Sequence, residues 1–319
     1  MIVVLSGGVG AARLLSGVLD VVEATDVTAI VNTGDDVVLH GLHISPDIDT
    51  ITYTLSGAVN PDTGWGQRGE TWQAMDALER FVPVRPDGSG AAATWFRLGD
   101  RDLATHLYRT HRLAEGAPLS TVTAEITRAF GLDLTMLPVT DDRLETRVTT
   151  AAGEIGFQEY FVGQRHSVAV SAVRFAGAEH AKPGPGVLEA LHDAEVIIIA
   201  PSNPLVSIGP LLAVPGVRDA IVARRRDVVA VSPIIAGAAL KGPADRMLSE
   251  LGHDSSALGV ARLYAPLAST LVIDEADRAL STGIASAGIE AVVAETIMRT
   301  PAIAAELARV VLAAARSAR

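Results

Sequence analysis

The sequence has no cysteine among its 319 residues, and this absence removes several kinds of chemistry at once. Disulfide bonds, thiolate catalysis and cysteine-ligated zinc sites are all excluded. No stretch of about 20 residues runs without polar interruption, so no membrane-spanning helix is expected. The first apolar run is too short for a signal peptide and no basic segment precedes it, so a cytoplasmic location is expected.

Basic residues are also in the minority. The 26 lysines and arginines stand against 37 aspartates and glutamates, which gives a formal net charge of −11. Because nucleic-acid phosphates require a basic face, binding to nucleic acid is not expected. A nucleotide ligand is still compatible with this charge, since a single phosphate site needs only a helix N-terminus, a few basic side chains or a metal ion held by carboxylates.

What the sequence does contain is a regular alternation of apolar runs and helical patterns. The apolar runs that read as buried strands are Ile2–Leu5, Val27–Val31, Val196–Ala200, Val228–Val231 and Leu271–Asp274. Near-continuous valine and isoleucine runs are typical of a parallel sheet covered by helices on both faces. We therefore predict one large α/β domain over residues 1–319, with a Rossmann-like, mostly parallel sheet flanked by helices.

Three other segments have different patterns. Helical patterns dominate residues 50–137, which predicts a mainly helical insertion over the ligand edge of the sheet. The pattern over Glu145–Gly177 predicts antiparallel strands. The alanine-rich segment Glu295–Ala315 predicts an amphipathic helix at the end of the chain.

The segment SGGVGAAR (residues 6–13) forms a glycine turn between the first predicted strand and a helical pattern. This layout presents backbone N–H groups to a phosphate in many proteins. A P-loop is excluded because no Lys-Ser/Thr pair follows, and a dinucleotide fingerprint lacks its third glycine, where Arg13 stands. An NAD(P)-dependent oxidoreductase is kept as the alternative, and a simple tight turn is a further interpretation.

Three more polar turns follow predicted strands: NTGDD (32–36), APSNP (200–204) and SPIIAG (232–237). Serine and asparagine are ordinary turn residues, so one such turn carries little information. Four turns of similar chemistry at the carboxyl ends of four strands, where open sheets bind ligands, favour a site for a nucleotide diphosphate.

Aspartates gather in and shortly after the turn NTGDD (32–36). Asp47 and Asp49 would point the same way in an extended segment, and Asp35 and Asp36 come shortly before them. Converging carboxylates would hold Mg²⁺ through hard oxygen ligands. Equally, the aspartates could cap a helix beginning near Thr50, and their spacing does not separate the two interpretations.

Taken together, seven segments resemble the 2-phospho-L-lactate transferase family of coenzyme F-420 biosynthesis (the CofD/FbiA type). The segments are SGGVGAAR, NTGDD, HGLHISPDIDTITYTL, GWGQRGETW, LGDRDLATH, APSNPLVSIGP and VSPIIAGAALKGPAD. Each is weak alone, and their shared order, which runs to about Asp245, carries the resemblance. Members transfer a phosphorylated three-carbon acid from a guanosine-diphospho-activated donor to the deazaflavin Fo (7,8-didemethyl-8-hydroxy-5-deazariboflavin), release GMP and require Mg²⁺.

This resemblance implies roles for individual residues. The implied nucleotide-binding residues are Gly7, Gly8, Gly10, Ser202, Asn203 and Ser232. Asp49 and Arg97 fall on the family's deazaflavin-binding positions, and Asp49 is the expected catalytic residue. Mg²⁺ is expected on Asp49, with Asp35 or Asp36 as further ligands.

Branches of the family differ in the three-carbon acid, which is 2-phospholactate, phosphoenolpyruvate or 3-phosphoglycerate. The segments look closest to the branch that uses phosphoenolpyruvate, and the resemblance also implies a homodimer. Two rival hypotheses are kept: the oxidoreductase named above, and a nucleotide-binding protein without catalytic activity. Neither rival would bind both the deazaflavin and GDP.

Overall fold

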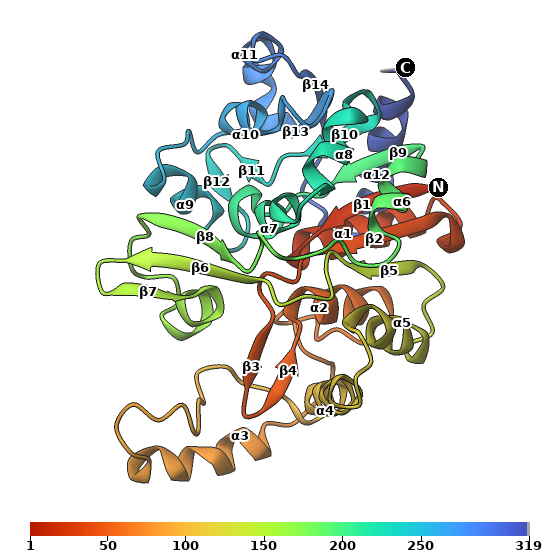
Figure 1. Ribbon diagram of the computed structural model, residues 1–319. Helices are drawn as coiled ribbons and strands as arrows, with labels where there is room; N and C mark the ends of the chain where they lie inside the picture. The colour runs from red at the N-terminus through yellow and green to blue at the C-terminus, as the bar shows by residue number, and fades with distance from the viewer. Residues whose placement is uncertain (318–319) are drawn as a thin grey trace.

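The computed structural model describes residues 1–317 and is built around a seven-stranded sheet (Figure 1). The strands are β1 (Ile2–Ser6), β2 (Val27–Val31), β5 (Thr135–Pro138), β9 (Val196–Ile199), β10 (Val228–Val231), β13 (Thr270–Asp274) and β14 (Glu290–Ala294). Every neighbouring pair in this sheet is parallel. The predicted Rossmann-like sheet is therefore confirmed, with β5 and β14 as strands that the sequence did not predict.

The strand order, β14-β13-β10-β9-β1-β2-β5, reverses at β1. From β1 the chain moves outward to β2 and β5, and it then returns to β9 on the other side of β1. The crevice between the carboxyl ends of β1 and β9 is therefore a topological switch point, where open α/β sheets bind their ligands.

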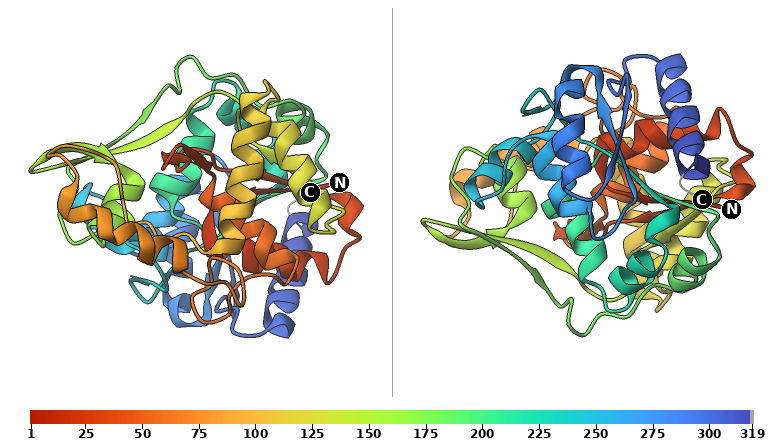
Figure 2. Two further views of the ribbon diagram at one scale, coloured as in Figure 1. Left: turned by 90° about the horizontal axis from the view of Figure 1, so that it is seen from below. Right: turned by 90° about the horizontal axis from the view of Figure 1, so that it is seen from above.

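Helices cover both faces of the sheet because successive strand residues point to opposite sides. One face is covered by α1 (Gly8–Leu19), α2 (Pro46–Leu55) and α12 (Pro301–Ser317). The other face is covered by α6 (Val187–Asp193), α7 (Gly209–Ala213), α8 (Val217–Ala223), α10 (Ala257–Tyr264) and α11 (Ser281–Ser286). On the first face α12 packs beside α1, although they stand at opposite ends of the chain (Figure 2).

A long segment between β2 and β5 carries the predicted insertion. Its elements are β3 (Val37–Leu39), β4 (Leu42–Ile44), α2, α3 (Gln73–Leu78), η2 (Glu79–Val84), α4 (Asp100–Ala114) and α5 (Leu119–Ala129). The part that contains α3 extends away from the sheet (Figure 1). Helices predominate in this segment, and β5, which follows it, belongs to the sheet.

A three-stranded antiparallel sheet follows, made of β6 (Glu145–Thr150), β7 (Gly153–Gly156) and β8 (Ala172–Ala176). These are the predicted antiparallel strands, but a π-helical turn, η3 (Glu159–Gly163), interrupts them. The last helix begins at Pro301 rather than at residue 295, because β14 continues to Ala294 and proline favours the first position of a helix.

The remaining elements are short. They are η1 (Ala24–Asp26), η4 (Pro204–Ile208), η5 (Arg225–Asp227), β11 (Ile234–Ile235), β12 (Ala238–Ala239), α9 (Ala244–Glu250) and η6 (Glu275–Leu280). Within residues 1–317, no single helix has both the length and the apolar character to cross a membrane. One sharply bent pair, Pro204–Ala213 with Val217–Ala223, meets those criteria jointly.

Candidate active site

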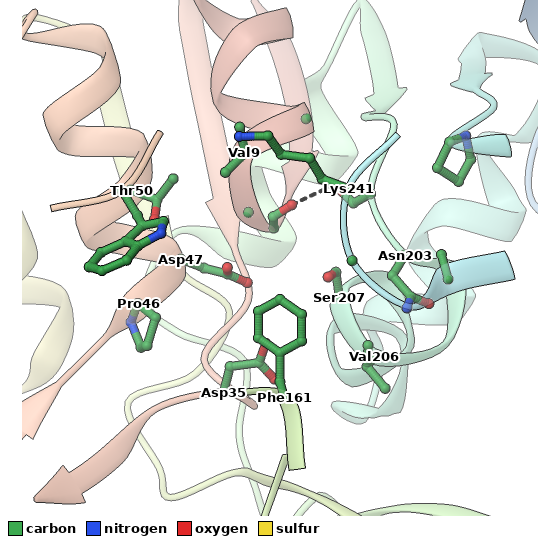
Figure 3. Close-up of a pocket in the computed structure, with 18 of the residues that line it drawn as sticks. Val9, Asp35, Pro46, Asp47, Thr50, Phe161, Asn203, Val206, Ser207 and Lys241 are labelled. Atoms are coloured by element: carbon green, nitrogen blue, oxygen red, sulfur yellow. Dashed lines mark hydrogen bonds between the residues drawn. The ribbon is translucent and has the colours of Figure 1, made fainter. Parts of the chain in front are cut away.

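A cavity of ≈ 530 Å³ lies over the switch point (Figure 3). The turns after β1, β9 and β10 contribute to it from the sheet, and α2, α4 and η3 contribute from the segments above. This volume is in the range of small-molecule sites. The predicted site residues that line the cavity are Gly7, Gly8, Gly10, Asp35, Asp49, Arg97, Ser202, Asn203 and Ser232. Asp36 is half-buried, with a buried Oδ1 atom, and does not line it.

The glycine turn lets the segments after β1 and β9 approach each other closely. A Cβ on Gly10 would lie 2.2 Å from the carbonyl oxygen of Pro201, and one on Gly7 would lie 2.7 Å from the Cβ of Ser207. Gly8 has a φ of 72°, in the left-handed region that favours glycine. The three glycines therefore place the N-terminus of α1 at the cavity, directly beside the turn that follows β9.

The polar side chains at the strand ends hold their own turns in shape. Ser202 Oγ donates a hydrogen bond to the Gly7 carbonyl at 2.7 Å and so links the turns after β9 and β1. Ser232 Oγ donates to the Ile234 carbonyl at 2.9 Å. Asn203 Oδ1 accepts from the Leu205 N–H at 2.9 Å and caps η4. A nucleotide-binding role for these three residues stays a prediction.

Asp47 and Asp49 both lie in the first turn of α2, which begins at Pro46. The extended conformation considered for them is therefore wrong, and the helix starts earlier than Thr50. Residues two positions apart in a helix are rotated by about 200° around its axis, so the two carboxylates point to different neighbours. Asp47 accepts a hydrogen bond from Asn32 Nδ2 at 2.9 Å and another from the Gly8 backbone. Asp49 faces α4 instead.

Asp35, Asp36 and Asp47 form a buried acidic cluster beside the N-terminus of α1. Burial raises the pKa of Asp36 to about 8 and the pKa of Asp47 to about 6. The pKa of Asp35 is raised well above its ordinary value, first by burial and then by the charges of Asp47 and Asp36. The Oδ1 atoms of Asp35 and Asp36 are buried without a hydrogen-bond partner. A hard cation is stabilising beside carboxylate oxygens that lack hydrogen-bond partners.

Asp49 belongs to a second charged group, formed with α4. Both terminal nitrogens of Arg109 contact its carboxylate, Nη1 at 3.1 Å from Oδ2 and Nη2 on Oδ1. His106 Nδ1 lies 3.7 Å from Asp49 Oδ2, and His106 Nε2 lies 3.2 Å from Asp102 Oδ1. Asp102 also accepts a hydrogen bond from the Tyr53 hydroxyl at 2.7 Å. This group was not predicted from the sequence, although Asp102, His106 and Arg109 recur at the spacing of one helix face.

The two charged groups differ as metal sites. Asp49, Asp102 and His106 offer ligand atoms that all lie within 4.8 Å of one another. The Arg109 guanidinium, however, already supplies a positive charge to both oxygens of Asp49. The Asp35–Asp36–Asp47 cluster, by contrast, keeps unpartnered oxygens. Among the described residues 1–317, only the Asp49–Asp102–His106 group brings three ligand atoms this close together, and the identity of the metal ligands stays a prediction.

Basic and aromatic side chains line the rest of the cavity. Arg97 pairs with Asp76 and with Glu79 at 3.3 Å, and its guanidinium lies 5.4 Å from the centre of the Trp72 ring. Lys241, which follows the hairpin of β11 and β12, donates a hydrogen bond from Nζ to the Thr63 carbonyl at 3.4 Å. The ring of Phe161, on η3, points into the cavity (Figure 3), and Trp65 and Phe96 also line it. Neither Lys241 nor Phe161 was singled out as a site residue from the sequence.

The strand order and the cavity at its switch point define a Rossmann-like protein that binds a ligand at the carboxyl edge of its sheet. Residues 2–308 match the family model of 2-phospho-L-lactate transferase CofD, and the chain belongs to that family. It is therefore an enzyme of the transferase type. This confirms the resemblance seen in the sequence.

Curated relatives agree with this assignment. The chain is 43% identical to a phosphoenolpyruvate transferase of Streptomyces griseus, over 100% of this chain and 99% of the relative. It is 42% identical to phosphoenolpyruvate transferases of Streptomyces coelicolor (100% and 99%) and Mycolicibacterium smegmatis (89% and 90%). A crystal structure of a UPF0052 family member from Bacillus halodurans covers 98% of both chains with a TM-score of 0.60. At 16% identity, that likeness shows the fold alone.

Proposed function

We propose that this enzyme transfers a phosphorylated three-carbon acid from a guanosine-diphospho-activated donor to the ribityl hydroxyl of the deazaflavin Fo, releases GMP and acts in coenzyme F-420 biosynthesis. The observation that carries the proposal is that one cavity has two chemically different ends. The glycine turn and the turns after β9 and β10 come from the sheet, whereas Asp49 and Arg97 come from the segment between β2 and β5. Two substrates of different chemistry fit such a cavity.

The donor's diphosphate would lie at the N-terminus of α1, where helix N–H groups favour an anion. Asp47 accepts a hydrogen bond from Gly8 at this same place, so a diphosphate and Asp47 would repel each other. Mg²⁺ held by Asp35 and Asp47, with Asp36 close behind them, would remove this repulsion. The unpartnered oxygens of Asp35 and Asp36 fit that ion. When bound, Mg²⁺ would neutralise charge on the diphosphate.

The acceptor would lie against Asp49 and Arg97. Asp49 would accept a hydrogen bond from the deazaflavin, and Arg97 would contact its polar edge. Trp65 and Phe96 line the same part of the cavity and offer apolar surface to a flat ring. Phosphoryl transfer through a loose transition state depends mainly on positioning and charge neutralisation, so these residues would act by holding the hydroxyl in line with the phosphorus.

The physiological donor in this proposal carries the enolpyruvyl group, as the names of the relatives suggest. Enolpyruvate differs from lactate by a planar carbon and two hydrogens, and sites discriminate such small apolar differences by only about 1–3 kcal/mol. Partial use of the phospholactyl donor is therefore expected. We also propose that the enzyme is a homodimer, which sedimentation would test by giving twice the mass of one chain.

The test offers both activated donors in competition, with Fo and Mg²⁺, and identifies the product by mass. The expected product is the dehydro form, and a dominant product two hydrogens heavier would overturn the choice of donor. Calorimetry with GDP and NADH tests the transferase proposal itself. Tight binding of NADH without binding of GDP would favour the oxidoreductase alternative instead.

A further inference from the structure

Arg109 is the bulkiest wholly buried side chain in residues 1–317, and it does not line the cavity. It lies on α4, behind Asp49, which does line the cavity and is 4% exposed. Besides its two contacts with Asp49, its Nη1 donates to the His43 carbonyl at 3.3 Å. Any effect of Arg109 on a ligand must therefore pass through a residue that it contacts and that lines the cavity, namely Asp49 or His106.

The pairing determines what Asp49 can offer to a ligand. A carboxylate has about four lone-pair directions, and the guanidinium fork uses one on each oxygen and fixes the plane of the group. The remaining directions are available on the side that lines the cavity. Because both of its oxygens accept hydrogen bonds from the guanidinium, the carboxylate presents acceptor lone pairs to the cavity. The ligand must then present an N–H or O–H group to Asp49.

Arg109 also determines the state of His106. Its Nη1 lies 3.2 Å from His106 Nδ1, and because arginine can only donate, Nδ1 must accept. In the neutral ring the proton then sits on Nε2, which lies 3.2 Å from Asp102 Oδ1. His106 keeps no free lone pair with which to take a proton from a ligand. Asp49 and Asp102, which both line the cavity, are therefore the hydrogen-bond acceptors of this group that are left for the substrate, and Arg109 contacts only Asp49.

We infer that Arg109 is a positioning residue that holds Asp49 in a fixed orientation as the acceptor for a hydrogen-bond donor of the acceptor substrate. This inference rests on the proposed function, which places the deazaflavin at Asp49. The competing interpretation is that the ion pair only ties α2 to α4. That purely structural role would affect the stability of the fold but not the choice of ligand.

The variant Arg109→Lys tests the inference, because lysine keeps the positive charge and loses the planar fork. The matched control is Arg112→Lys on the same helix, where Arg112 pairs with Glu115 and Glu125 at the surface. Dissociation constants for Fo and GDP are measured by fluorescence and calorimetry, together with KM for each substrate. For Arg109→Lys we expect about a tenfold or greater rise in Kd and KM for Fo, with the GDP values within about twofold of wild type.

A second measurement uses the wild-type enzyme and so does not depend on the folding of a variant. Fo is compared with analogues in which each N–H or O–H donor is methylated in turn. At least one analogue is expected to bind about tenfold or more weakly, because an acceptor-only carboxylate cannot hydrogen-bond a methyl group. The inference is overturned if every analogue binds like Fo, or if folded Arg109→Lys binds Fo like wild type. Failure of the wild type to bind Fo would instead overturn the proposed function, and the inference with it.

Discussion

Asp47 and Asp49 stand two residues apart on α2, and the turn of the helix places them beside groups of opposite charge. Asp47 lies among other carboxylates and accepts hydrogen bonds from Asn32 and the Gly8 backbone. Asp49 lies against the buried guanidinium of Arg109. Neutralising Asp47 removes repulsion from the neighbouring carboxylates, whereas neutralising Asp49 removes its attraction to Arg109. The same chemical change, aspartate to asparagine, should therefore have opposite effects on stability.

For Asp49→Asn we expect loss of Fo binding and turnover together with a less stable fold. The amide leaves Arg109 buried without its counter-charge, which typically costs about 3–5 kcal/mol. Urea denaturation measures the free energy of unfolding, and fluorescence titration measures Fo binding. The control is Glu306→Gln, which breaks an exposed pair with Arg309 and should change stability by less than about 1 kcal/mol. Normal stability and normal turnover in Asp49→Asn would contradict the role given to this residue.

For Asp47→Asn we expect the metal-free protein to be more stable than wild type at pH 8. We also expect the variant to bind Mg²⁺ much more weakly. The amide removes one of the charges that repel Asp35, and with it one carboxylate ligand. Turnover measured against Mg²⁺ concentration should show saturation at a higher concentration than in wild type. An unchanged Mg²⁺ dependence would remove Asp47 from the metal site.

At the scale of elements, α1 approaches two neighbours at glycines. A Cβ on Gly10 would lie 2.2 Å from the Pro201 carbonyl oxygen, and one on Gly17 would lie 2.2 Å from the Ala304 carbonyl oxygen on α12. The two contacts are equally close, but only the first lies at the cavity. They therefore allow the packing of α1 to be separated from its role in the site.

We expect Gly10→Ala and Gly17→Ala to lower the melting temperature alike, because each forces a backbone away from α1. Only Gly10→Ala should also weaken GDP binding, since it displaces the turn after β9 from the N-terminus of α1. Differential scanning fluorimetry and calorimetry with GDP would measure the two effects. Equal loss of GDP affinity in both variants would mean that the glycine turn has no specific part in the nucleotide site.

The elements that the sequence predicted well are those whose pattern is local. The strand β2 and the strand β10 coincide with the predicted runs Val27–Val31 and Val228–Val231, because central parallel strands are apolar on both faces. The edge strands β5 and β14 were missed, since TMLP and EAVVA carry partly exposed residues and lack a continuous apolar run. The start of α12 was placed too early for the same reason.

The candidate site was predictable where strand ends supply it, and not where helices face each other. Turns after parallel strands must meet at one edge of the sheet, so Gly7 and Ser202 could be placed together although they lie far apart in the chain. The pairing of Asp49 with Arg109 depends on how α2 and α4 pack, 60 residues apart, and no local pattern encodes it. The separation of Asp47 from Asp49 likewise depended on knowing where α2 begins.

At the scale of the whole molecule, the acidic cluster should make stability depend on pH. A carboxyl whose pKa is raised by folding binds its proton more tightly in the folded protein than in the unfolded chain. Its contribution to the free energy of unfolding therefore falls as the pH rises from the unfolded pKa, near 4, to the folded pKa. The folded pKa is about 6 for Asp47 and about 8 for Asp36. The metal-free protein should be less stable at pH 8 than at pH 5.

Urea denaturation in chelator at several pH values measures this loss, which is about 1.4 kcal/mol for each pH unit over which one carboxyl stays protonated only in the folded state. Mg²⁺ at saturating concentration should restore stability at pH 8, because it binds the folded protein in place of those protons. Stability that rises steadily from pH 5 to pH 8 in chelator would contradict the raised pKa values of the cluster.

The packing of α12 against α1 has a consequence for synthesis of the chain on the ribosome. The helix α1 is complete within the first twenty residues, whereas Ala304, whose carbonyl faces Gly17, belongs to the last helix described. Throughout translation of the intervening sheet, the side of α1 that meets α12 has no cover. The nascent chain should therefore depend on chaperones until release, and a stalled product ending before Pro301 should be a target for proteolysis even though its cavity residues are already complete.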